Sequence, residues 1–116
     1  MHEFSLVHST LEIALRAAQE NNAIRITSIT IEVGELIEAS EELLHFAFDA
    51  LSEDTIAEGA EFCVDMIPVA SKCNECNKEF EHSRFQVKCP YCGSINCTFI
   101  HGRELQVASL EVDAPE

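Results

Sequence analysis

The sequence predicts an α+β protein, with two helices, a small, mainly antiparallel three-stranded sheet and an inserted four-cysteine module. Three observations predict this fold class. Two segments place apolar residues at helical spacing, three segments alternate apolar and polar residues as strands do, and residues 71–98 hold five of the six cysteines. We therefore expect one α+β domain over residues 1–70 and 99–116, and a separate metal-binding domain over residues 71–98.

The first helix is predicted over residues 5–20, followed by a strand over residues 24–33. The apolar residues at helical spacing are Leu6, Leu11, Ala14, Leu15 and Ala18. In the strand, Ile29, Ile31 and Val33 alternate with polar residues, and β-branched residues dominate. Gly34 then marks the strand end or a bulge.

The second helix is predicted over residues 41–52. Ser40 is a suitable N-cap, and acidic residues follow it at the positive end of the helix dipole. Its apolar residues are a buried stripe of Leu44, Ala47, Phe48 and Leu51, widened by Leu43 and Phe46.

Two further strands are expected, over residues 60–69 and 103–112. Pro68 indicates an edge strand or a strand end in the first of them. In the second, the alternation slips between Val107 and Leu110, which indicates a bulge near Ala108.

The composition narrows the class of protein. The chain has 7 basic and 21 acidic residues, a formal net charge of −14, so nucleic acid and anionic membranes are not expected partners. No stretch approaches ~18 consecutive apolar residues, so no transmembrane helix is expected. The N-terminus lacks the pattern of a secretory signal. We expect a cytoplasmic protein, in which paired CxxC motifs are metal ligands rather than disulfides.

Four cysteines form the most specific motif in the chain. Two residues separate Cys73 from Cys76, two separate Cys89 from Cys92, and twelve lie between the pairs. This spacing lets each tight turn aim two sulfurs at one ion, and the loop between the turns completes a tetrahedron. Gly93 follows the second pair, where the turn needs backbone freedom. The motif predicts a four-thiolate metal site.

Zinc is the predicted metal, and its role is structural, because four sulfur ligands leave no open position. Four thiolates and a divalent zinc add −2, which takes the loaded chain from −14 to −16. Iron is the alternative, since CPxCG turns also occur in rubredoxin-like centres and ligand type alone does not separate the two metals. Cys63 and Cys97 are interpreted as ordinary, half-buried residues.

The N-terminus is a candidate for a second metal site. The chain begins Met1-His2-Glu3, and a side chain as large as histidine at position 2 disfavours removal of Met1. The free amine of Met1, the imidazole of His2 and the deprotonated amides of His2 and Glu3 would form a nitrogen-rich, roughly square-planar set. Such sets suit nickel(II) or copper(II).

The other polar side chains carry weaker signals. His8 is interpreted as a solvated or capping residue and His45 as a half-buried helix residue. Glu41 and Glu42 are interpreted as charges that favour the start of the second helix. The sequence contains no GxxxxGK[ST] phosphate loop. We therefore predict that the chain is not an enzyme and depends on a partner for any nucleotide hydrolysis.

Taken together, these motifs resemble one protein family over essentially the whole chain. The opening MHEFSL, the acidic α+β pattern, VGEL at residues 33–36, the CxxC and CPxCG pairs and the late RELQVASLEV are similar to the HypA/HybF family of hydrogenase maturation nickel chaperones. The resemblance implies that His2 is the essential nickel ligand beside Met1 and Glu3, and that the four cysteines bind zinc. Family members also carry histidines flanking the cysteine pairs, and His82 and His101 do not match that feature cleanly.

The resemblance implies a metallochaperone that holds nickel as transient cargo. Its expected partners are a HypB-type GTPase and the large subunit of a nickel–iron hydrogenase, and in some organisms the family serves urease. Two alternatives belong to other classes. A zinc-ribbon adaptor would carry a basic face, which residues 71–98 lack, and a rubredoxin-like redox protein would be coloured by its iron. The sequence leaves open the nickel affinity, the oligomeric state and the enzyme served.

Overall fold

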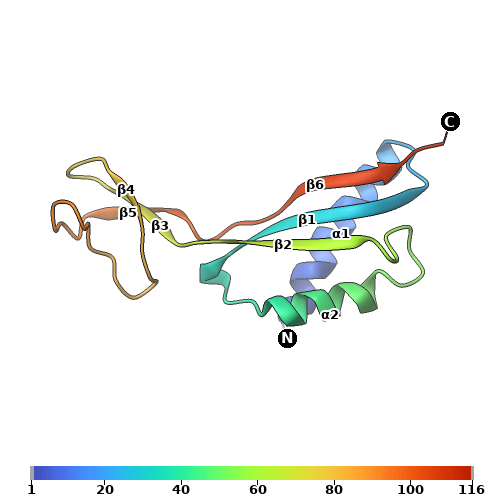
Figure 1. The fold of residues 1–116 in the computed structure, drawn as a ribbon, viewed down its shortest axis with the longest axis horizontal. Helices are drawn as coiled ribbons and strands as arrows, with labels where there is room; N and C mark the ends of the chain where they lie inside the picture. Colours follow the sequence, from blue (N-terminus) through green and yellow to red (C-terminus); the bar gives the residue numbers. More distant parts are fainter. Residues whose placement is uncertain (1, 116) are drawn as a thin grey trace. The chain divides into compact units, whose positions relative to one another are not determined.

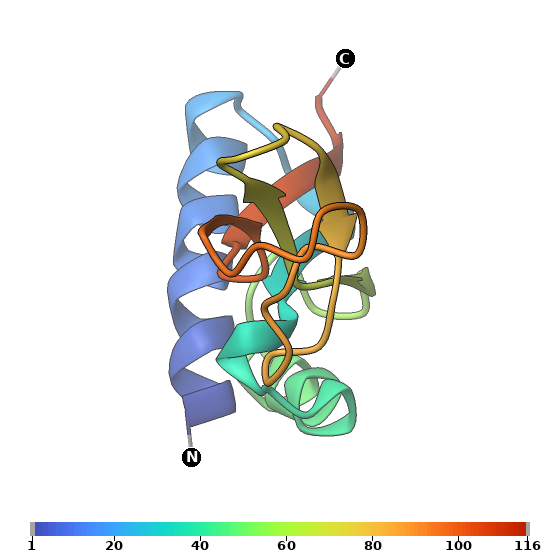
Figure 2. The ribbon, with the colours of Figure 1, turned by 90° about the vertical axis from the view of Figure 1, so that its left-hand side faces the viewer.

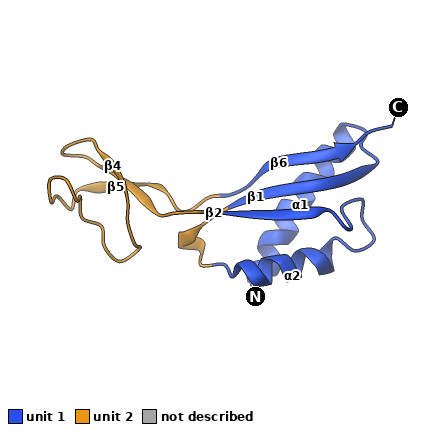
Figure 3. Ribbon diagram, viewed as in Figure 1, with its two compact units in different colours: residues 1–32, 39–65, 105–116 blue, residues 33–38, 66–104 orange. Residues whose placement is uncertain are grey.

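The structure is a computed structural model that describes residues 2–115 in two compact units (Figure 3). Unit 1 comprises residues 1–32, 39–65 and 105–116, and unit 2 comprises residues 33–38 and 66–104. The elements, labelled in Figure 1, are α1 (His2–Glu20), β1 (Arg25–Gly34), the 3-10 helix η1 (Glu35–Ile37), α2 (Glu41–Leu51), β2 (Glu61–Ile67), β3 (Ala70–Cys73), β4 (Glu79–Glu81), β5 (Cys97–His101) and β6 (Leu105–Asp113).

Helix α1 begins at His2, three residues before the predicted start (Figure 2). Its buried residues are Glu3, Val7, Thr10, Leu11, Ala14 and Ala18. Leu6 and Leu15, two of the apolar residues at helical spacing, are half-buried. Thr10 can take a buried position because its hydroxyl donates to the carbonyl oxygens of Leu6 and Val7, at 3.1 Å each.

The sheet of unit 1 has the strand order β2-β1-β6, with β1 in the centre. In β1, Ile29, Ile31 and Val33 are fully buried and the residues between them are half-buried, which confirms the predicted alternation. Ile26 is also fully buried. Strands β1 and β2 run in the same direction on either side of the α2 crossover, whereas β6 runs the opposite way (Figure 1). The sheet is therefore mixed. Strand β2 is parallel to β1 because α2 returns the chain to the end of the sheet at which β1 began.

Helix α2 has the predicted N-cap, since the side-chain oxygen of Ser40 accepts from the backbone nitrogen of Leu43 at 3.3 Å. Leu44, Ala47 and Phe48 are buried. The ring of Phe48 stacks on that of Phe62 in β2, with centroids 4.3 Å apart. Phe46, which was predicted to widen the apolar face of α2, is 60% exposed.

Unit 2 contains a second three-stranded sheet, with the order β4-β3-β5, which the sequence did not predict. Both neighbours of β3 are antiparallel to it. These strands are only three to five residues long, with the sequences ASKC, EFE and CTFIH, so they are too short to show the apolar alternation of a strand signal. The sheet holds the cysteine module, and the overall α+β fold class is confirmed.

Two chain segments of unit 2 cross at two glycines. The nitrogen of Gly34 donates to the oxygen of Glu104, and the nitrogen of Leu36 donates to the oxygen of Gly102, both at 2.8 Å. A Cβ atom on Gly34 would lie 2.0 Å from the Gly102 oxygen. Gly34 is therefore required because a side chain has no space there. Its φ of −70° suits any residue, so backbone conformation is not the reason. Within the described residues, no helix has the length and apolarity to span a membrane.

Candidate metal sites

The structure brings the four predicted cysteines of unit 2 into one cluster. The sulfur atoms of Cys73, Cys76, Cys89 and Cys92 all lie within 4.8 Å of one another. The sulfurs of Cys73 and Cys92 are 3.5 Å apart, and those of Cys76 and Cys89 are 3.6 Å apart. These separations are far longer than a disulfide bond, which is about 2.05 Å, and the six cysteines are all free thiols.

The two CxxC pairs lie in two separate backbone turns that have the same hydrogen-bond pattern. The nitrogen of Cys73 donates to the oxygen of Lys78 at 2.9 Å, and the nitrogen of Asn77 donates back to the oxygen of Cys73 at 2.8 Å. The second turn repeats this pattern around Cys89, with Ser94 and Gly93 in the equivalent places and both distances 2.9 Å. The two halves of the site are thus built alike.

Both turns need a residue with positive φ directly after the second cysteine. Gly93 fills this position with a φ of 77°, as predicted, and Asn77 fills the matching position with a φ of 63°. Asparagine is one of the few side chains that tolerates the left-handed region. Asn77 was missed in the sequence, although its place one residue after Cys76 matches that of Gly93 after Cys92.

Without a cation, the four sulfurs cannot all carry a negative charge. The backbone N–H of Cys76 is the main cause that lowers the pKa of Cys73, to about 6. The backbone N–H of Ser94 lowers the pKa of Cys92, but its thiol neighbours, Cys73 foremost, outweigh that effect and raise it to about 12. One thiolate therefore suppresses the ionisation of the next, and a divalent cation at the centre would relieve this repulsion.

The cluster fits a tetrahedral metal ion. Metal–sulfur bonds of about 2.3 Å in a regular tetrahedron place the sulfurs roughly 3.8 Å apart, close to the two separations above. Additional support comes from the backbone nitrogen of Tyr91, which lies 3.4 Å from the sulfur of Cys89. Cys73 and Cys89 are buried and Cys92 is exposed, so the site is largely enclosed with one sulfur at the surface.

The predicted N-terminal site lies on α1, in unit 1. Met1 lies outside the described residues. His2 is the first residue of α1 and its side chain is 52% exposed, with its Nδ1 atom 3.8 Å from Oε1 of Glu3. The first four N–H groups of a helix have no carbonyl acceptor within that helix. The amides of His2 and Glu3 are therefore not committed to the helical hydrogen-bond ladder.

The Glu3 carboxylate is held by the start of α2. Its Oε2 atom accepts from the backbone nitrogen of Ser40 at 3.0 Å, and the residue is 6% exposed. The hydrogen bond from Ser40 is the largest cause that lowers the pKa of Glu3, followed by one from its own N–H. The negative charge lies at the N-terminal ends of both α1 and α2, where helix dipoles favour it. Sequence reasoning placed Glu3 at the metal but did not find this link to Ser40.

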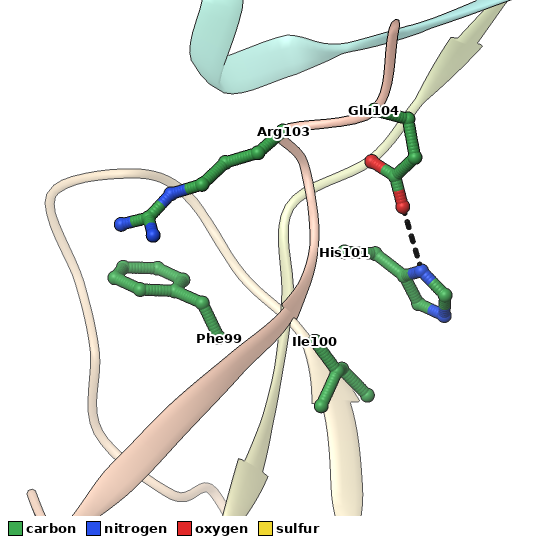
Figure 4. A pocket seen from close by; sticks show the side chains of 5 residues that line it. All are labelled: Phe99, Ile100, His101, Arg103 and Glu104. Atoms are coloured by element: carbon green, nitrogen blue, oxygen red, sulfur yellow. Dashed lines mark hydrogen bonds and ion pairs between the residues drawn. The ribbon is translucent and has the colours of Figure 1, made fainter. Parts of the chain in front are cut away.

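The other histidines do not join the four-cysteine cluster. Both ring nitrogens of His82 have partners: Nε2 lies 2.7 Å from the hydroxyl of Ser71, and Nδ1 lies 2.6 Å from the oxygen of Ser83. His101 places Nδ1 2.8 Å from Oε2 of Glu104, beside a hollow of about 280 Å³ lined by Phe99, Ile100, His101, Arg103 and Glu104 (Figure 4).

The fold and the cysteine cluster define a class of small α+β proteins in which one chain contains a helix-and-sheet unit and a four-cysteine module suited to a metal ion. Comparison with known proteins agrees over nearly the full length. The family model described as "Hydrogenase/urease nickel incorporation, metallochaperone, hypA" matches residues 1–112. The chain is 38% identical to the hydrogenase maturation factor HypA of Aquifex aeolicus over 113 residues, 97% of this chain and 98% of that one.

Two further relatives agree with this match. The hydrogenase maturation factor HybF of Klebsiella pneumoniae is 38% identical over 111 residues, 96% of this chain and 98% of that one. The solution structure of the Ni metallochaperone HypA from Helicobacter pylori has a TM-score of 0.72 at 26% identity, and covers 99% of this chain and 100% of that one. The chain belongs to the HypA family of nickel metallochaperones, which serve hydrogenase and urease maturation and are not enzymes.

Proposed function

We propose that this chain carries nickel at its N-terminus while a separate zinc ion holds the four-cysteine module together. The Met1 amine, the His2 imidazole and the His2 and Glu3 amides would bind nickel as cargo. Cys73, Cys76, Cys89 and Cys92 would bind zinc as a resident structural ion. In this proposal, residues 1–70 and 99–116 form the nickel-binding domain and residues 71–98 the zinc-binding domain.

The observation that carries the proposal is the separation of two unlike ligand sets. The four sulfurs form a closed cluster in unit 2, whereas His2 is exposed at the start of α1 in unit 1. A closed four-thiolate site retains its metal, while a terminus with few ligands exchanges it readily. The sulfur set suits zinc and the nitrogen set suits nickel, so one chain can keep one ion and release the other.

The expected partners of this chain are inferred from the net charge of its two units and from its family. Unit 1 holds 2 basic and 15 acidic residues, a net −13, whereas unit 2 holds 5 and 6, a net −1. A surface this acidic favours a partner with a basic face. We propose that the partners are a HypB-type GTPase, which would supply the nucleotide hydrolysis, and the hydrogenase large subunit, which would accept nickel. The free thiols support a cytoplasmic location.

The test is metal analysis of the purified, untagged chain before and after it is mixed with nickel. We expect one zinc that survives desalting and one nickel that a mild chelator removes. Visible absorption is measured on the same sample as purified, because a four-thiolate iron centre would be coloured. Colour, or a nickel that displaces zinc from the sulfurs, would contradict the two-site proposal.

A further inference from the structure

A fifth thiol lies beside the four-cysteine cluster. Cys97 starts β5 and is the register partner of Cys73, the last residue of β3. Cys97 also packs against the buried core that Cys73 forms with Phe80 and Cys89. Its sulfur is outside the group whose members all lie within 4.8 Å of one another, so it is adjacent to the site without completing it.

The hydrogen bonds of the sheet show how these two residues face each other. The nitrogen of Cys73 donates to Lys78, on the side of β4, whereas the nitrogen of Asn74 donates to the oxygen of Asn96, on the side of β5. Cys73 and Cys97 therefore form a non-hydrogen-bonded pair, the closer of the two antiparallel pairings, with Cα atoms about 4.5 Å apart. Side chains of such a pair lie together on the same face.

Cys97 has no strong competing partner in the described structure. Its thiol makes a long contact of 3.7 Å with the oxygen of Ser94, and weak thiol hydrogen bonds are easily exchanged. Both residues are held by backbone, because β5 and β3 are paired along four register positions. A rotation about the Cα–Cβ bond of Cys97 would move its sulfur without disturbing the pairing of either strand.

We propose that Cys97 is a reserve metal ligand that can take the place of Cys73. The site would then have two four-thiolate forms, which share Cys76, Cys89 and Cys92 and differ in the fourth sulfur. Both forms have the same charge, because Cys97 would lose its thiol proton as it binds while the displaced Cys73 sulfur takes one up, and the ion would keep its other three thiolates throughout. This inference rests on the proposed zinc site and adds one ligand to it.

Four variants of the full chain test the exchange: Cys73→Ser, Cys97→Ser, the double variant, and Cys92→Ser as the matched control. Cys92 is the ligand of the other turn and has no register partner in β3. Each protein is assayed for bound zinc. Each is then loaded with cobalt(II), whose sulfur-to-metal absorption distinguishes four thiolates from three.

Cys73→Ser and Cys97→Ser are each expected to keep one zinc and a four-thiolate cobalt spectrum. The double variant and Cys92→Ser are expected to lose zinc or to show three thiolates. In zinc-loaded Cys73→Ser, Cys97 should also resist alkylation, whereas it should be modified in the zinc-loaded wild type.

The reserve role is overturned if Cys73→Ser behaves like Cys92→Ser, if it fails to fold with excess zinc, or if Cys97 stays reactive in it. A wild type that binds neither zinc nor cobalt through four thiolates would overturn the proposed zinc site itself. The wild-type result therefore separates the two failures.

Discussion

At the residue scale, the start of α1 combines an exposed imidazole with a buried carboxylate. His2 is open to solvent, whereas Glu3 is held on the backbone of Ser40. The carboxylate thus holds the first turn of α1 on Ser40, while the backbone amides of His2 and Glu3 have no carbonyl acceptor within the helix. This division of roles leads to one prediction for each residue.

His2→Ala is expected to abolish specific nickel binding and to leave the zinc content unchanged. The two proposed sites share no ligand, so loss of one imidazole should affect only the cargo site. Calorimetric titration with nickel measures the first effect and metal analysis the second. His8→Ala is the matched control, because His8 is also exposed on α1 but pairs with Glu12 at 3.1 Å. Equal loss in both variants would place nickel elsewhere.

Glu3→Gln is expected to lower the melting temperature near neutral pH but not in acid. The pKa of Glu3 is lowered in the folded state from its usual 4.5, so the unfolded state binds the proton more tightly. The stability from this charge is therefore present above about pH 4.5 and lost as pH falls through the lowered pKa. Melting of both proteins from pH 7 to 3 checks this, with the exposed Glu20→Gln as control. A constant difference at every pH would contradict it.

At the element scale, glycines act for two different reasons in unit 2. Gly34 has an ordinary φ but no space for a side chain, because the Gly102 oxygen lies where its Cβ would be. Gly93 has space, since its Cβ would meet only the Cε atom of Lys88 at 3.7 Å, but its φ of 77° is left-handed. Substitution of Gly93 therefore measures the cost of backbone strain, and substitution of Gly34 measures the cost of a steric clash.

Gly93→Ala is expected to cost about 1–2 kcal/mol, the price of a left-handed alanine. Gly93→Asn should cost less, because Asn77 adopts the same conformation in the first turn. Gly34→Ala should cost more than either, since two backbone segments must separate. Urea unfolding of the zinc-loaded proteins gives all three values. If Gly34→Ala proved the mildest, the close crossing with Gly102 would be wrong.

At the scale of the whole molecule, the two units are stabilised by different means. Unit 1 has an apolar core that includes Ile26, Ile29 and Leu44. The core cluster around the cysteines of unit 2 is small and groups Phe80 with Cys73 and Cys89. A cluster of this size offsets little of the entropy of ordering its chain, and the proposed zinc ion would supply the difference.

Zinc removal is therefore expected to disorder residues 71–98 and to spare α1, α2 and β1. Zinc contributes about 10–16 kcal/mol of apparent binding energy in small zinc-finger peptides, and loss of it should leave residues 71–98 without a stable fold. Amide NMR spectra of the Cys92→Ser variant, and of the wild type after a chelator has removed its zinc, should both show disorder in residues 71–98 and order in α1, α2 and β1. Cys63→Ser, altered on β2 in unit 1, should match the loaded wild type. Unfolding of both units together would contradict separate stabilisation.

Local patterns in the sequence determined the parts of this protein that depend on near neighbours. The spacing of Cys73, Cys76, Cys89 and Cys92 identified the cluster, because two intervening residues define one turn. Ser40 identified the start of α2, and the alternation from Ile29 to Val33 identified the central strand. These signals are readable because the interacting groups lie within a few positions of one another.

Only the tertiary structure decided the features that join distant positions. The strands of unit 2 are too short to carry an alternating pattern, so their order came from pairing across the cysteine turns. The bond between Glu3 and Ser40 spans 37 positions, and Gly34 meets Gly102 across the chain. The pairing of Cys73 with Cys97 likewise depends on the register of two strands. Such contacts have no local signature, because their partners become neighbours only when the chain has folded.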